Sequence, residues 1–183
     1  MKQLLLVSWL LSLSAILGLP EVKADVRMPL IFGNHMVLQQ DTRITIWGWA
    51  DAGENIEVLF AGQKVRTTAN ADGTWQVKLK PVKTKKKGET LTITGKNKLV
   101  YSDVLVGDVW VASGQSNMEW GIKVRKEYAD DIAHSEDSLL RLFFVPKNTS
   151  LQPLSEIEIP QGTASPEPVS YTHLRAHETS LHL

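Results

Sequence analysis

The feature of this chain best suited to nucleophilic chemistry is a serine that follows an apolar run. The run Val109-Trp110-Val111-Ala112 ends in Ser113-Gly114-Gln115-Ser116. In an α/β protein, a buried strand brings the chain to the carboxyl edge of the sheet, a glycine permits a tight turn, and a helix opens with its N–H groups facing that turn. Ser116 is then expected to project into a cleft, where its hydroxyl can act as a nucleophile.

A serine near a glycine also has a structural interpretation, because most such serines cap a helix or close a turn. Met118 occupies the place of the second glycine in a Gly-x-Ser-x-Gly elbow, so the ordinary α/β-hydrolase fold fits poorly. Catalysis is favoured by the longer block around the serine, by its apolar approach and by segments further upstream.

Four segments resemble the sialate O-acetylesterase family of SGNH-type carbohydrate esterases. They are Gly114-Gln115-Ser116-Asn117-Met118-Glu119-Trp120 and residues 104–110, 32–39 and 47–50. The similarity runs from about residue 27 to about residue 169. It implies a serine esterase that removes acetyl groups from sugar hydroxyls, with a flavodoxin-like catalytic domain preceded by a β-sandwich. Acetylated sialic acid is the first substrate to consider, and acetylxylan or another acetylated glycan is the alternative, since the chemistry is the same.

The resemblance makes Ser116 the nucleophile, and the backbone N–H of that residue is a candidate oxyanion donor. Gln115 and Asn117 are the candidate substrate-binding residues; their amides either hold the turn or line the acetyl pocket. Glu119 is interpreted as a first-turn acid that favours the helix dipole. Asp108 is expected to cap or pair at the domain junction. No cofactor and no metal are implied.

A serine hydroxyl also needs a base, and the family takes it from a downstream Asp-x-x-His block that is absent before residue 169. His35 matches a family position without a catalytic role, and His134 lies on a variable helix. The polypeptide as written is therefore expected to be a nearly inactive N-terminal fragment.

The two ends of the chain are expected to lie outside the folded part. Residues 1–24 are typical of a signal peptide, because Lys2 precedes an apolar run over 4–19 and Ala24 ends a cleavage signal. That run is shorter than the about 20 residues of a membrane anchor. We therefore expect a periplasmic or secreted protein that leaves the membrane after cleavage.

Residues 169–179 match the translation of a transposon adapter used for sequencing libraries, and we interpret the tail over 169–183 as an artefact. His173 and His177 lie in this tail at the spacing of one helix face, which is a pattern of metal sites. The artefact is the preferred interpretation.

Composition narrows the range of partners. The formal net charge is zero, with 20 basic and 20 acidic residues, so there is no electrostatic footprint for nucleic acid or an anionic membrane. The chain has no cysteine, which excludes disulfides and thiol catalysis. The expected partner is an acetylated carbohydrate.

The hydrophobic periodicity changes near residue 107. Residues 25–106 alternate with period two and predict an antiparallel β-sandwich, Ig-like or jelly-roll-like. Its strands are expected at 44–47, 56–60, 64–68, 74–79, 90–94 and 99–101, with turns at 51–54, 61–63, 70–73 and 95–97 and a solvated lysine-rich hairpin tip at 83–87.

Residues 107–168 are expected to be the truncated start of a flavodoxin-like α/β SGNH hydrolase domain. Its elements are a buried strand over 104–112, an irregular helix within 117–137 and a second buried strand over 139–145.

Three tryptophans of the first domain, Trp47, Trp49 and Trp75, raise a competing hypothesis. Tryptophans stack on sugars, so the chain could be a secreted, non-catalytic carbohydrate-binding β-sandwich. Trp47 and Trp49 share one face of a strand, and packing is the preferred interpretation. A structural Ig-like adhesion module has only the strand pattern in its favour.

Overall fold

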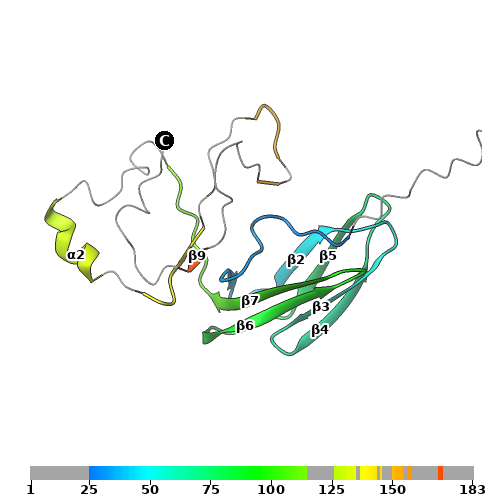
Figure 1. Cartoon of the computed structure of the whole chain (residues 1–183), viewed down its shortest axis with the longest axis horizontal. Coiled ribbons are helices and arrows are strands. Elements are labelled where there is room, and N and C mark those ends of the chain that lie inside the picture. Colours follow the sequence, from blue (N-terminus) through cyan, green and yellow to red (C-terminus); the bar gives the residue numbers. More distant parts are fainter. Residues whose placement is uncertain are drawn as a thin grey trace, which may run out of the picture.

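The structure, a computed structural model, describes residues 25–114, 126–134, 137–143, 145, 150–154, 156–157 and 169–170. Strands dominate the first of these ranges (Figure 1). In chain order they are β1 (Val37–Gln39), β2 (Ile44–Trp49), β3 (Asn55–Phe60), β4 (Gln63–Thr68), β5 (Thr74–Leu79), β6 (Lys85–Thr94) and β7 (Lys98–Gly107).

Each strand expected from the period-two pattern is present, and β2 illustrates why. Ile44 and Ile46 are buried on one face while Trp47, which follows them on the other face, is exposed, as alternation across a strand requires. The turns are also confirmed: Gly53, Gly62 and Gly73 have φ of 77°, 74° and 80°, where a side chain would be strained.

The lysine-rich segment is a correction to the expected hairpin tip. Lys85, Lys86 and Lys87 are exposed, but they form the beginning of β6, and Lys85 pairs with Val106 of β7. Backbone hydrogen bonds to β7 hold this polar end of β6. Such bonds do not need apolar side chains, so the sequence gives no hydrophobic pattern that would indicate a strand here.

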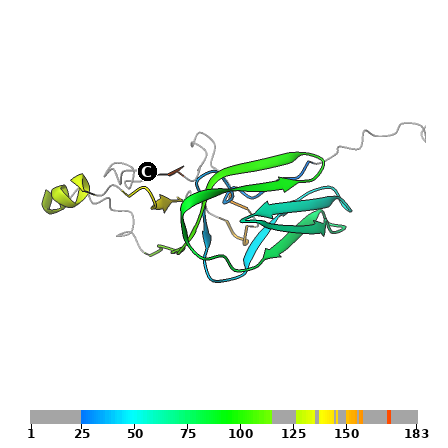
Figure 2. The same cartoon turned by 90° about the horizontal axis from the view of Figure 1, so that it is seen from below.

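The strands form two sheets. The larger one has the order β1-β7-β6-β3-β4, and β2 pairs with β5 in the smaller one. In Figure 2 the long β6–β7 hairpin, drawn in green, shows how the larger sheet curls. The prediction of purely antiparallel pairing is wrong at one position, because β1 and β7 run parallel with Val37 opposite Leu105. The chain crosses to the smaller sheet twice, at β2 and at β5, and returns to the larger sheet at β3 and at β6.

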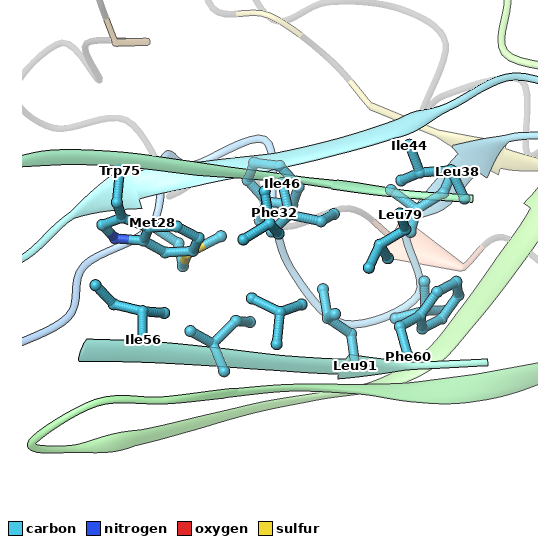
Figure 3. Close-up of a cluster of buried hydrophobic side chains, with 14 of the residues drawn as sticks. Met28, Phe32, Leu38, Ile44, Ile46, Ile56, Phe60, Trp75, Leu79 and Leu91 are labelled. Atoms are coloured by element: carbon cyan, nitrogen blue, oxygen red, sulfur yellow. The ribbon is translucent and has the colours of Figure 1, made fainter. Parts of the chain in front are cut away.

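Both sheets contribute to one apolar cluster (Figure 3). Its labelled members include Ile44, Ile46, Trp75 and Leu79 of β2 and β5, and Ile56, Phe60 and Leu91 of β3 and β6. Full burial of one such side chain stabilises the fold by about 1.5–3 kcal/mol. This shared core fixes the two sheets relative to each other.

Beyond β7 the expected buried strands differ from the structure. Val104, Leu105 and Val106 are buried on β7, but the strand ends at Gly107, and Trp110 and Val111 are 87% and 91% exposed. The strand expected over 139–145 is reduced to β8 (Arg141–Leu142), with Leu139 and Val145 exposed. An apolar run becomes a buried strand only where other elements cover both faces, and the described residues provide no such cover here.

The remaining described elements are short. The expected irregular helix is represented by η3 (Lys126–Tyr128) and α2 (Ala129–Ala133), and β8 pairs antiparallel with β9 (Val169–Ser170). The expected signal peptide, residues 1–24, lies outside the described residues, and so do the two histidines of the tail that suggested a metal site. Within the described part, no helix has the length and apolar character to cross a membrane.

Candidate functional site

The residues expected at the reaction centre, Gln115, Ser116 and Asn117, lie outside the described residues, as does Glu119. Gly114 is the last described residue before them, and Lys126 is the first after them. The described parts of the candidate site are therefore its two flanks, which are the exit of β7 and the segment around β8.

The exit of β7 is fastened to the end of β1. The N–H of Gln40 donates to the carbonyl of Gly107 at 2.9 Å, and the N–H of Val109 donates to the Gln39 side-chain oxygen at 2.8 Å. Asp108 accepts a hydrogen bond from the Gln40 amide at 3.1 Å. These bonds direct the chain toward the serine block. They also agree with the pairing role that the sequence suggested for Asp108.

The second flank reaches β7 through an ion pair. Arg141 of β8 donates from Nη2 to Oδ2 of Asp103 at 3.0 Å, and His35 Nδ1 lies 2.7 Å from the same oxygen. The hydrogen bond from His35 lowers the pKa of Asp103; partial burial opposes this shift and Arg141 adds to it. Asp103 is therefore a carboxylate at neutral pH.

Local backbone geometry makes this cluster possible. His35 and Asp103 have φ of 63° and 52°, in the left-handed region that Asp and His enter more readily than most residues. Gly88 on β6 faces Asp103 so closely that a Cβ there would lie 2.7 Å from its Cα. Asn34 accepts a hydrogen bond from the N–H of Ser102 at 2.8 Å, which binds the turn before β1 to β7.

Sequence reasoning did not single out Asp103 or Arg141. The available signal was the polar pair Ser102-Asp103, which interrupts the apolar stretch from Leu99 to Val106. An interruption of this kind marks a position with its own partners. The partners themselves, 68 and 38 residues away, could not be found from local pattern.

The structure gives both histidines of the described part structural partners. His35 is bound to Asp103, and His134 Nδ1 lies 2.8 Å from the carbonyl oxygen of Asp130 at the end of α2. That neither histidine is the base stays a prediction. Among the described residues there is no group of three or more His, Asp or Glu placed to hold a metal ion.

The three tryptophans separate into two environments. Trp75 is 2% exposed in the core, so it is not available to stack on a sugar. Trp47 and Trp49 lie on the opposite face of β2. There Phe32 packs edge-on against Trp47 at 4.7 Å between ring centroids, and the Arg27 guanidinium lies 4.0 Å from the Trp49 ring centroid. Arg27 also pairs with Glu156 at 2.6 Å. Both tryptophan rings therefore have contacts within the protein, as the packing interpretation requires.

A hollow of about 630 Å³ opens on the larger sheet, beside β3 and β4. Its lining includes Asn55, Glu57, Arg66 and Thr94. Glu57 is paired with Lys64 at 3.0 Å and with Arg66 at 2.7 Å, and these hydrogen bonds lower its pKa.

Comparison with known proteins identifies the family. The chain is 34% identical over 141 residues to sialate O-acetylesterase of Rattus norvegicus and 32% identical over 141 residues to that of Mus musculus, with 68% and 69% of the chain aligned. It also matches the crystal structure of a carbohydrate acetylesterase from Xanthomonas citri, with a TM-score of 0.70 and 34% identity over 84% of this chain and 35% of that one. The chain belongs to the sialate O-acetylesterase-like family. No family model matches it.

The resemblance to the sialate O-acetylesterase family is thereby confirmed. This family member spans about a quarter of the length of the two rodent relatives, 25% and 26%. The aligned 68% of this chain amounts to about 124 of its 183 residues, and a stretch of that length includes residues 114–120 wherever it begins. The serine block therefore lies inside the region of similarity.

Proposed function

We propose that this family member is a serine esterase that removes O-acetyl groups from sugars, and that its substrate is an acetylated sialic acid. The observation that carries the proposal is the serine block at 114–120, within a region similar to relatives named sialate O-acetylesterase and to a neighbour named carbohydrate acetylesterase.

The proposed mechanism is acyl transfer. Ser116 attacks the carbonyl carbon of the acetyl ester while a base accepts its proton, and the sugar hydroxyl leaves with a proton as the acetyl-enzyme forms. Water then attacks the acetyl-enzyme and releases acetate. The backbone N–H of Ser116 is the proposed oxyanion donor, and Gln115 and Asn117 are proposed to position the substrate.

The proposal places the base and its orienting acid outside residues 25–168, so these residues alone should release acetate slowly or not at all. It also includes a β-sandwich over 25–106, the start of an SGNH domain over 107–168, an artefactual tail over 169–183 and export to the periplasm or medium after removal of residues 1–24. The shared core of the two sheets supports the sandwich.

The first experiment is to resequence the source locus beyond the codon for Pro168 without a transposon adapter, and to express the reading frame as it continues there. Ser116→Ala should lower acetate release from O-acetylated sialic acid by at least about 10³-fold without loss of folding. Ser113→Ala, three residues earlier in the same block, is the matched control and should retain activity. Normal turnover by the Ser116 variant would show that Ser116 is not the nucleophile. Faster acetate release from acetylxylan than from O-acetylated sialic acid would show that the proposed substrate is wrong.

A second candidate function is a carbohydrate-binding module without catalysis. It is favoured by Trp47, which is 39% exposed on the outer face of β2 opposite Gln76 of β5. If this function is correct, the chain should be retarded in gels that contain a glycan, and Trp47→Ala should abolish the retardation. Equal mobility with and without glycan would exclude it.

A further inference from the structure

The ion pair between Asp103 and Arg141 joins the two sides of the serine block. Asp103 lies on β7, which enters the block, and Arg141 lies on β8, which follows it. The two residues are 38 positions apart, and Ser116 stands between them in the sequence. Their contact therefore closes a loop that contains the proposed nucleophile.

Arg141 is held in a nearly buried place. Its side chain is 7% exposed, and its other guanidinium hydrogen bonds go to the carbonyl oxygens of Ser138 and Leu140 in its own segment. Within the described residues its Nε has no hydrogen-bond partner. A buried cation needs its counter-ion, so loss of the Asp103 charge should release Arg141 from this place.

Asp103 is the fixed member of the pair. The residues on either side of it, Tyr101 and Val104, are paired with β6. His35 holds its carboxylate at 2.7 Å, and Gly88 leaves room for it on the neighbouring strand. Arg141 stands on a strand of two residues, which is weak by itself. The rigid sheet therefore positions β8, and not the reverse.

We propose that Asp103 and Arg141 are a positioning pair for Ser116. The pair fastens β8, which follows the serine block in the sequence, to the N-terminal sheet, and Gln39 and Gln40 fasten the segment that precedes the block. A misplacement of about 1 Å in a reacting group can cost about 100-fold in rate, so this support should appear in kcat. The inference rests on the proposed esterase function for its catalytic consequence, but the ion pair that it invokes does not depend on that function.

The first test measures amide hydrogen exchange over residues 137–143 in the 183-residue chain. Asp103→Asn and Arg141→Met should each accelerate exchange there by at least about 10-fold, and the double variant should add little, because both changes break one interaction. Arg66→Met is the matched control: it removes an Arg–carboxylate pair of similar length, 2.7 Å to Glu57, on the same sheet. It should leave residues 137–143 unchanged. Unchanged exchange in both single variants would overturn the proposal.

The second test measures acetate release in the form of the protein that carries a complete catalytic apparatus. Asp103→Asn and Arg141→Met should lower kcat by about 10-fold or more with KM changed by less than about 3-fold, and Arg141→Lys should recover part of the loss. Protected amides of β3 and β6 show whether each variant is folded. A folded variant with normal kcat would overturn the positioning role. Activity in Ser116→Ala would overturn the esterase function instead, leaving the exchange result to stand.

Discussion

At the scale of single residues, charge pairing around Asp103 is the best-defined feature of the candidate site. One carboxylate receives His35 of the turn before β1 and Arg141 of β8, so three segments distant in sequence meet at one oxygen. Both His35 and Asp103 occupy the left-handed backbone region, a cost that persists only where the surroundings hold it in place.

The lowered pKa of Asp103 predicts a pH dependence of stability. Because the folded-state pKa lies below the ordinary value of 3.8, the folded protein binds fewer protons than the unfolded chain between these two values. The stabilising contribution of Asp103 is thus present above about pH 4 and is lost as the pH falls through the lowered pKa. In urea unfolding, the stability difference between wild type and Asp103→Asn should shrink as the pH falls below about 4. A difference that grows as the pH falls would contradict this.

At the scale of elements, an apolar segment is buried only where another element packs against it. The alternating strands β2, β3 and β5 bury one face against a shared core, and their positions follow from their sequences. The continuous apolar runs near 109–112 and 139–145 have a stronger hydrophobic signal but no covering layer among the described residues. Hydrophobicity alone therefore did not decide which segments are buried.

Core packing predicts a contrast between two leucines on neighbouring strands. Leu91 of β6 is fully buried, whereas Leu59 of β3 is 45% exposed on the opposite face of the same sheet. Leu91→Ala should lower the free energy of unfolding by about 2–5 kcal/mol because it leaves a cavity. Leu59→Ala should lower it by less than about 1 kcal/mol. Denaturant unfolding measures both, and equal costs would show that the two faces have been misassigned.

At the scale of the whole molecule, the chain combines a packed N-terminal part with apolar residues that remain exposed beyond it. Trp110, Val111 and Leu151 are almost fully exposed. Trp110 and Val111 are consecutive in the sequence, and exposed apolar side chains that form a patch are typical of surfaces that contact another protein or another part of the same one.

These exposed residues predict that the 183-residue chain self-associates. Light scattering coupled to size exclusion should show oligomers whose fraction rises with protein concentration. Replacing Trp110 with Gln and Val111 with Thr should reduce them. Val100→Thr, at an exposed apolar position on the sheet face of β7, is the control and should change association little. A monomer at all concentrations would contradict the prediction.

Local sequence determined strands β2 to β5 and their turns, the burial of Trp75 and the family to which the chain belongs. These features depend on side-chain alternation, on glycine φ angles and on short motifs, all of which are contained in a few consecutive residues. The roles of Gln115, Ser116 and Asn117 rest on such a motif and remain predictions.

Only the tertiary structure decided the parallel pairing of β1 with β7, the fate of the apolar runs after Gly107, and the joining of His35, Asp103 and Arg141. The pairing and the three-residue contact join partners 38 or more residues apart, and the fate of the apolar runs depends on whether other elements cover them. A polar residue within an apolar stretch, such as Asp103, indicates that hydrogen-bond partners are needed at that position. Which partners it finds depends on how the sheets bring distant strands together.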